Sequence, residues 1–163
     1  MANRKSIREV TRVQYLTFHL NGVQYAVDVK IVETVVERSA ITAVPTPVEY
    51  MRGVMDLRGR VIPVIDLRTK FGMPASDDES RASIIVFTVD GGRGQILTVG
   101  ALVDAVSEVV TIEEKDIEAR RTEGAALWER YVRGIIRFEQ RMVVVIEAEG
   151  LFSINELAAL HAA

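Results

Sequence analysis

The side chains that most often carry chemistry are few in this sequence. The chain has no cysteine and only two histidines, His19 and His161. His19 alternates with apolar residues in a segment rich in strand formers, and His161 lies in a segment expected to be helical. Because metal sites and nucleophilic centres need several such groups to converge, the sequence predicts no transition-metal site, no cofactor and no enzymatic activity.

Two further segments could bind an ion. Residues 91–94, Gly-Gly-Arg-Gly, suggest a phosphate-binding loop, but a strand-like run follows them, whereas a phosphate loop opens a helix with Gly-Lys-Ser/Thr. A hairpin turn is therefore favoured. Asp77, Asp78 and Glu79 could bind a hard cation, but they lack the spacing of a calcium loop, so a solvated linker is favoured there.

The polar residue that stands out is Arg58. It sits with Gly59 between two apolar, β-branched runs in the stretch 52–67, a pattern that predicts a hairpin with an arginine at its tip. Arg58 is either a solvated turn residue or an anchor for a partner, because arginine beside apolar residues is frequent in binding hot spots. Pro63 in the second arm predicts a strand with one open side.

The other elements follow from periodicity, turn residues and caps. Strands are predicted at 15–20, 23–29, 41–44, 83–90 and 95–110, with a second hairpin at 135–146 that turns near 139–140. Residues 30–36 fit a helix and a strand equally well. Short helices are predicted at 46–49, 67–71, 111–114, 125–132 and 153–161, of which the first and last begin with capping-box patterns and the second is capped by Asp66.

Length and composition indicate a globular chain. It has 163 residues, 48% of them apolar and 26% charged, enough for one compact domain or two small lobes. The net charge of −3 gives no electrostatic case for nucleic acid as a partner. Residues 1–13 are polar and mildly basic and are expected to form a flexible arm. The first residues lack an apolar segment, so they are not expected to be a signal peptide. No apolar run is long enough to span a bilayer, so a soluble, cytoplasmic protein without membrane insertion is expected.

The two halves of the chain resemble each other. Residues 52–55 match 133–136 at a shift of 81 positions, 27–28 match 103–104 at 76, and 16–18 match 85–87 at 69. Residues 74–80 form the most linker-like stretch and lie near the middle. We interpret this as a duplicated β-unit forming two small barrels with a boundary near 74–82, followed by the C-terminal helix 153–163.

The run from Gly53 to Gly72 resembles the signature of the CheW family of chemotaxis coupling proteins. Family blocks also occur, in the right order, at 18–20, 25–29, 41–45, 100–109 and 134–152. The resemblance covers residues 14–153. It implies an all-β fold with a few short helices, in which two five-stranded SH3-like barrel lobes lie side by side.

The resemblance also implies a function. Members of this family are adaptors that couple the cytoplasmic tips of methyl-accepting chemotaxis receptors to the regulatory domain of the histidine kinase CheA. They are recruited to receptor arrays at the inner face of the cytoplasmic membrane. An alternative is a β-barrel module that couples a CheA-like kinase to a sensory system other than chemotaxis.

Carried over by position, the resemblance assigns a receptor-binding groove. Its expected residues are Val32, Thr34, Arg58, Gly100, Val106 and Val109. Gly100 would let a receptor helix approach closely. Thr34 stands where many relatives have glutamate, and Asp56 stands where many have asparagine. An acid at position 56 could pair with Arg58 or Arg60. No kinase-contact residue is assigned.

Overall fold

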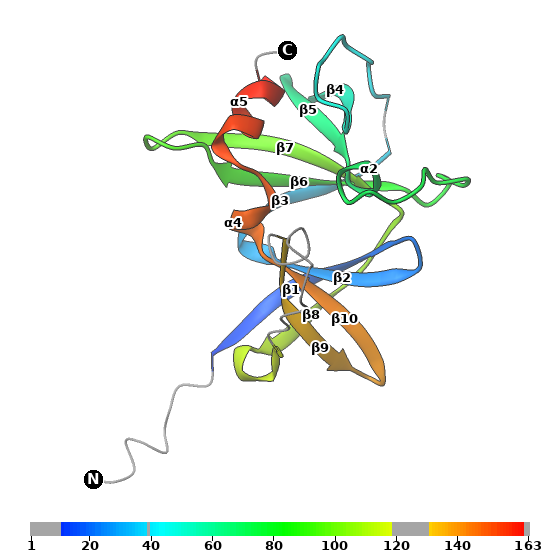
Figure 1. Ribbon diagram of the computed structural model, residues 1–163, viewed down its shortest axis with the longest axis vertical. Coiled ribbons are helices and arrows are strands. Elements are labelled where there is room, and N and C mark those ends of the chain that lie inside the picture. The colour runs from blue at the N-terminus through cyan, green and yellow to red at the C-terminus, as the bar shows by residue number, and fades with distance from the viewer. Residues whose placement is uncertain (1–10, 39, 119–130, 162–163) are drawn as a thin grey trace, which may run out of the picture.

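The computed structural model describes residues 11–38, 40–118 and 131–161, which form two stacked lobes (Figure 1). The first lobe is a sheet in the order β8-β1-β2-β10-β9, with β1 Arg12–Leu20, β2 Val23–Asp28, β8 Ala105–Glu113, β9 Val132–Phe138 and β10 Arg141–Ile146. The second is ordered β3-β6-β7-β5-β4, with β3 Val32–Glu37, β4 Met51–Leu57, β5 Arg60–Asp66, β6 Ser83–Asp90 and β7 Ile96–Val103. The predicted fold class is confirmed.

Short helices join and cover the strands. They are η1 Val29–Ile31, α2 Leu67–Lys70, η2 Glu114–Asp116, α4 Ala148–Leu151 and α5 Ile154–His161. The Asp66 carboxylate caps α2 by accepting the N–H groups of Arg68 and Thr69, as predicted. The capping box of α5 is also confirmed, because Ser153 and Glu156 exchange side-chain-to-backbone bonds of 3.0 and 3.1 Å.

Several local predictions need correction. No helix forms at 46–49: Thr46 Oγ1 accepts the N–H of Val48, but the chain turns at once to begin β4 at Met51. The strand predicted at 41–44 is reduced to one bridge, at Thr42. Residues 30–36 divide between η1 and β3, and the run 95–110 divides at Asp104 into two strands of different lobes.

Predictions near three further segments were also inexact. β8 continues to Glu113, so the helical turn expected at 111–114 is replaced by η2, which begins at Glu114. Residues 125–130 of a predicted helix lie outside the described residues, while Val132 already belongs to β9. Residues 1–10 of the predicted arm are likewise outside them, and Arg12 opens β1.

The boundary predicted near 74–82 is wrong, because the lobes exchange strands. The segment 74–82 connects α2 to β6, and the strands on both sides of it belong to the second lobe. The hairpin β1–β2 pairs instead with β8 and β10 from the other half of the chain. Strand pairing between distant segments therefore decides the lobes, and the midpoint of the chain does not.

The duplication itself is visible in how each lobe closes. Thr42 exchanges two backbone hydrogen bonds with Val54 in the second lobe, at 2.8 and 2.9 Å. Glu118 exchanges two bonds of the same lengths with Ile135 in the first. Val54 and Ile135 are the residues that the 81-position shift aligns.

The repeated Arg-Gly pattern has a steric cause at these closing contacts. A Cβ on Gly53 would lie 2.1 Å from the carbonyl oxygen of Thr42, and a Cβ on Gly134 would lie 2.6 Å from that of Glu118. Real Cβ atoms do not approach backbone so closely. Both positions therefore require glycine for the approach of a neighbouring backbone segment.

The main core is shared between the lobes. Its largest cluster includes Phe18 and Leu20 from the first lobe, and Phe87 and Leu67 from the second, all fully buried. Each such side chain stabilises the fold by about 1.5–3 kcal/mol relative to an exposed one. Two smaller clusters fill the individual lobes. Because the largest cluster spans both lobes, the lobes form one packed unit.

Pro63 lies in an inner strand, which corrects the prediction that its strand has an open side. β5 pairs with β4 on one side and with β7 on the other. The ladder to β7 begins only at Val64, one residue later. On the β4 side, both backbone groups of Val54, which faces Pro63, bond to Thr42. The proline nitrogen therefore sits where no ladder donor is needed.

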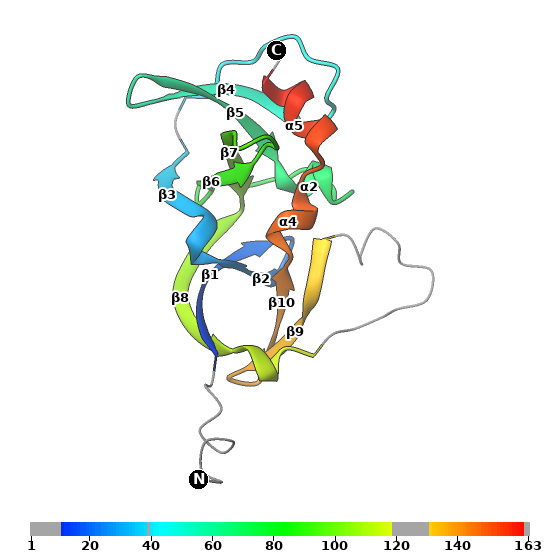
Figure 2. The same cartoon turned by 90° about the vertical axis from the view of Figure 1, so that its left-hand side faces the viewer.

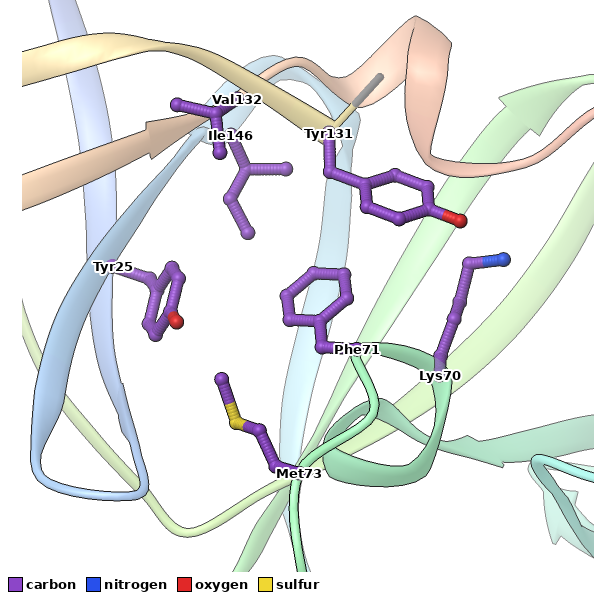
Figure 3. Close-up of a pocket in the computed structure, with 7 residues that line it drawn as sticks. All are labelled: Tyr25, Lys70, Phe71, Met73, Tyr131, Val132 and Ile146. Carbon is purple, nitrogen blue, oxygen red and sulfur yellow. The ribbon is translucent and has the colours of Figure 1, made fainter. Parts of the chain in front are cut away.

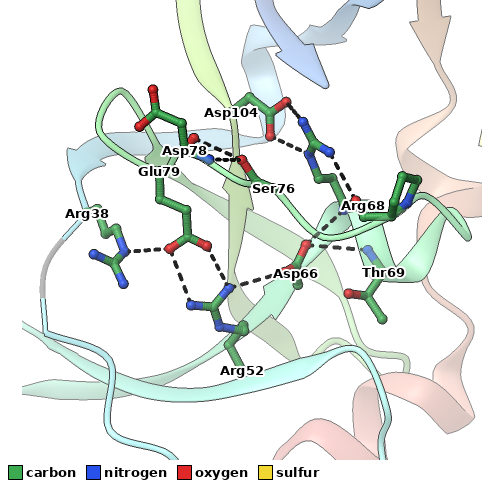
Figure 4. A network of polar contacts seen from close by, with 10 residues as sticks. Arg38, Arg52, Asp66, Arg68, Thr69, Ser76, Asp78, Glu79 and Asp104 are labelled. Carbon is green, nitrogen blue, oxygen red and sulfur yellow. Dashed lines mark hydrogen bonds and ion pairs between the residues drawn. The ribbon is translucent and has the colours of Figure 1, made fainter. Parts of the chain in front are cut away.

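A polar network secures the base of the hairpin β4–β5 (Figure 4). Arg52 pairs with both Asp66 and Glu79 at 3.2 Å, and Arg38 pairs with Glu79 at 3.0 Å. The hydrogen bond from Arg52 lowers the pKa of Glu79 below its usual value. Glu79 is thus a structural ion-pair partner and no part of a solvated linker.

Asp104 is the polar hub between the lobes (Figure 4). It follows β7 and precedes β8, and its carboxylate accepts hydrogen bonds from Arg68 at 2.7 and 2.5 Å and from the N–H of Asn21 at 2.8 Å. Burial opposes its ionisation, but these bonds outweigh burial and lower its pKa. It therefore joins α2 of the second lobe to the β1–β2 turn of the first.

Candidate functional site

Of the two histidines, His161 has a structural role. His161 holds α5, with Nδ1 2.8 Å from the carbonyl oxygen of Leu157 and Nε2 3.1 Å from that of Thr98. Residues 91–94 form the turn between β6 and β7, as the hairpin interpretation predicted. Within the described residues, no three His, Asp or Glu side chains gather in a way that could hold a metal ion.

Two β-bulges place four valines on equivalent surfaces of β3 and β8. In β3, Val32 lies opposite Phe87 and Val35 opposite Ile85, with a register shift between them. In β8, Val106 lies opposite Phe18 and Val109 opposite Leu16, again with a register shift. The four opposing residues belong to the shared core cluster. The bulges thus turn both valines of each strand toward the same face.

These four residues, the interlobe valines, share one side of the molecule. Val32 and Val106 pack partly against the shared core, while Val35 and Val109 remain 37% and 52% exposed. Figure 2 shows β3 and β8 following one another along one side, with α4 and α5 on the opposite side. The chain therefore presents exposed apolar side chains from both lobes on a common side.

Thr34 does not join the interlobe valines. Its partner across the ladder is Val86, which packs in the interior of the second lobe and not in the shared core. Val35, the next residue along β3, lies on that side instead. Sequence reasoning missed Val35 because regular alternation cannot reveal a bulge. The available signal was the spacing, since Val32 and Val35 recur as Val106 and Val109.

Gly100 is also separate from this face. It is buried in β7 between Val64 and Val86, and a Cβ there would lie 2.9 Å from Cγ2 of Ile84 and 3.5 Å from Cγ2 of Val64. The close approach that its glycine permits is therefore internal packing. This corrects the expectation that Gly100 makes room for a receptor helix.

Arg58 stands at the tip of the hairpin β4–β5, with φ of 52° followed by φ of 85° at Gly59. Asp56 Oδ1 accepts the N–H of Gly59 at 2.9 Å, so Asp56 stabilises the turn and pairs with neither arginine. Arg60 pairs instead with Glu33 at 2.5 Å. Within the described part of the chain, the exposed guanidinium of Arg58 has no ion-pair partner.

The structure thus brings together three of the six expected residues. Val32, Val106 and Val109 lie on the common side, joined by Val35. The β4–β5 hairpin, which carries Arg58, projects toward that side at the upper left of Figure 2. The arrangement can bind a partner through apolar contacts and one cation. No helix within the described residues is long and apolar enough to cross a membrane.

Comparisons with known proteins agree with this architecture. The model of the CheW-like domain matches residues 14–156. A Rhizobium etli protein named "Probable chemotaxis protein CheW" is 35% identical over 95% of this chain and 96% of its own length. The chemotaxis protein CheW of Bacillus subtilis is 31% identical over 86% of this chain and 87% of its own.

A solved structure shares the fold as well. The scaffolding protein TtCheW from Thermoanaerobacter tengcongensis superimposes with a TM-score of 0.74 and 32% identity, covering 90% of this chain and 96% of that one. The match spans both lobes. Since the domain model covers most of the chain and several relatives exceed 30% identity over nearly their full length, this protein belongs to the CheW family.

Proposed function

We propose that this protein is a non-catalytic adaptor that couples the cytoplasmic tip of a chemoreceptor to the histidine kinase CheA. Membership of the CheW family supports a chemotaxis scaffold, and the solved relative TtCheW is itself described as a scaffolding protein. The adaptor works at the inner face of the cytoplasmic membrane, where receptor tips are found.

The observation that carries the proposal is the exposure of Val35 and Val109 on one side of the two lobes. An amphipathic helix binds through apolar side chains at positions i, i+3, i+4 and i+7, which need an aliphatic surface longer than one strand. The interlobe valines supply such a surface from both lobes. A receptor tip of helical structure is a fitting occupant.

Arg58 adds a polar anchor to this surface. Its guanidinium can bind a carboxylate with two parallel hydrogen bonds, and its aliphatic stem can cover apolar surface. Asp56 fixes the turn that presents it. The receptor helix should therefore carry an acidic residue within reach of the hairpin tip.

Coupling requires a difference in contacts between two kinase states. A bound receptor can shift the kinase only by the difference in free energy that the adaptor's contacts contribute to each state. The shared core makes the two lobes a single rigid unit for transmitting such a difference. The adaptor itself needs no chemical step.

Co-sedimentation tests this function directly. The full chain is mixed with a CheA-type kinase, with receptor signalling fragments in vesicles, and with both together. We expect binding to each alone and a ternary complex in which the activity of the kinase rises several-fold. A chain that binds neither partner would refute the proposed function.

Three variants test the assignment of the receptor surface. Val109→Glu and Arg58→Ala should reduce receptor binding about tenfold or more while kinase binding is retained, because both side chains are exposed and their loss leaves the core unchanged. Ile96→Glu changes another exposed apolar side chain, in β7, and should leave receptor binding unchanged. Equal receptor binding by all three variants would contradict the assignment.

A further inference from the structure

A cavity of about 310 Å³ lies between the lobes, beside the end of α2 (Figure 3). Tyr25, Val132 and Ile146 line it from the first lobe, and Phe71 and Met73 line it from the second. The volume falls at the lower end of the range for small-molecule pockets, about 300–1,000 Å³. Its position differs from that of the interlobe valines, none of which lines it.

Aromatic rings give the cavity rigid, flat walls. The ring of Phe71 lies 6.0 Å from that of Tyr25 and 5.2 Å from that of Tyr131, centroid to centroid. Tyr25 stacks in turn on Phe18, at 5.7 Å, in the shared core. Rings held in this way are preorganised, so a flat apolar ligand could bind without reordering them.

Lys70 is the charged residue among the described ones that line the cavity, and its charge is already paired. The side chain of Lys70 is only 2% exposed, and its ammonium is paired with the carboxylate of Glu156. It also lies 4.4 Å from the ring centroid of Tyr50 and 5.2 Å from that of Phe152. In Figure 3 the ammonium points away from Met73 and Ile146. Among the described residues that line the cavity, a ligand would therefore meet no unpaired charge.

The hydroxyl of Tyr25 is a polar group that the cavity offers, while the hydroxyl of Tyr131 is directed toward Lys70 in Figure 3. Tyr25 is only 6% exposed, and Figure 3 shows its hydroxyl on the side of Met73. No other described residue forms a hydrogen bond with this hydroxyl. Burial raises the pKa of Tyr25, so the group stays protonated and can donate. A ligand oxygen in the cavity could therefore accept a hydrogen bond from this hydroxyl.

We propose that this cavity is a binding site for an uncharged, small aromatic or branched aliphatic compound whose carbonyl or hydroxyl oxygen accepts a hydrogen bond from Tyr25. The apolar walls supply affinity, and the Tyr25 hydroxyl supplies orientation. The site is independent of the proposed adaptor function, since its binding can be measured on the chain alone.

A matched pair of probes tests the proposal. Acetophenone carries a carbonyl oxygen, and α-methylstyrene has the same shape with a methylene group in its place. Each is titrated into the full chain, and the methyl resonances of Ile146 are followed by NMR. We expect saturable shifts with both probes and about fivefold tighter binding of acetophenone, the preference typical of one neutral hydrogen bond.

Three variants separate the cavity from the rest of the surface. Tyr25→Phe should weaken acetophenone binding about fivefold and leave α-methylstyrene unchanged. Met73→Trp should fill the cavity and abolish both shifts, while Met142→Trp, at a methionine that is 50% exposed on β10, should preserve them. Absence of saturable shifts in the wild type, or an unchanged probe preference in Tyr25→Phe, would overturn the proposal even if Met73→Trp failed to fold.

Discussion

The hairpins β4–β5 and β9–β10 occupy equivalent places in the two lobes and differ at their tips. Both turns have two residues with positive φ: Arg58 and Gly59 at 52° and 85°, and Glu139 and Gln140 at 50° and 66°. This is the geometry that matches the twist of a two-residue hairpin. Only the second lobe uses glycine there, and only its turn presents an arginine.

The arginines below the two tips make the difference clearer. Arg60 pairs with Glu33 on β3 and reaches Thr98 on β7, so the second-lobe hairpin is held to neighbouring strands. Arg141, at the equivalent position, pairs with Glu139 of its own hairpin at 3.4 Å. The backbone of the two lobes is thus duplicated while their surface chemistry has diverged. Among the described residues, only the second-lobe hairpin carries at its tip an arginine without an ion-pair partner.

Substitutions at the glycines of the two closing contacts, Gly53 and Gly134, should have the largest effect on stability. Gly53→Ala would force its Cβ against the carbonyl of Thr42 and would strain a backbone with φ of 148°. We expect a loss of about 3 kcal/mol in the free energy of unfolding, measured with urea.

Gly134→Ala provides the matched change in the first lobe. A Cβ at this position would lie 2.6 Å from the carbonyl oxygen of Glu118, compared with 2.1 Å for the Cβ of Gly53→Ala, and Gly134 has no positive φ. We therefore expect a smaller loss in the free energy of unfolding, about 2 kcal/mol. Losses below about 0.5 kcal/mol in both variants would show that the closing contacts do not require glycine.

A second difference lies at Lys70, whose equivalent in the repeat is the buried Leu151. Burial opposes ionisation of Glu156, but hydrogen bonds from Lys70 and Tyr50 outweigh it and lower the pKa to about 2. Lys70→Met removes the cation and should cost about 1–2 kcal/mol at pH 7, a figure reduced for the partial exposure of Glu156.

The pH dependence of this variant has a definite sign. A lowered pKa contributes stability above the unfolded value, near 4.5, and this contribution is lost as pH falls through the folded value, about 2. The free energies of unfolding of wild type and Lys70→Met should therefore converge as the pH falls from about 4.5 to about 2. A difference that stayed constant from pH 7 to pH 2.5 would contradict the ionic account.

Substitutions at the two hairpin tips should have the smallest effect on stability. Gln140→Gly should stabilise the first lobe by about 0.5–1 kcal/mol, because glycine adopts φ of 66° without the Cβ penalty that glutamine incurs. The reverse change, Gly59→Gln, should destabilise the second lobe by a similar amount. Thermal unfolding of both variants checks the pair. No stabilisation in Gln140→Gly and no destabilisation in Gly59→Gln would show that the turns are not strained.

Local signals predicted much of the fold. The two hairpins, the Asp66 cap and the α5 capping box were all found, because each depends on residues only a few positions apart. The helix expected at 46–49 failed because strand pairing at Met51 overrides a local cap. The exchange of strands between the lobes depends on contacts between distant segments, which propensities do not encode.

The strand register corrects one of the shifts of 69, 76 and 81 positions by which the two halves were first aligned. The parallel ladders pair Val64 with Gly100 and Val145 with Ala26, so β2 aligns with β7 at a shift of 74 and not 76. The same shift relates Val32 and Val35 to Val106 and Val109. An alignment built from strand register thus groups Val35 with Val109, whereas the resemblance alone gave Thr34.

The most direct test of the central claim compares Val35 with Thr34. Binding of a receptor signalling fragment is measured for Val35→Glu and Thr34→Ser, with the urea stability of each variant as a control for folding. If the interlobe valines form the docking surface, Val35→Glu lowers affinity at least tenfold and Thr34→Ser leaves it unchanged. Full affinity of a folded Val35→Glu would contradict the account.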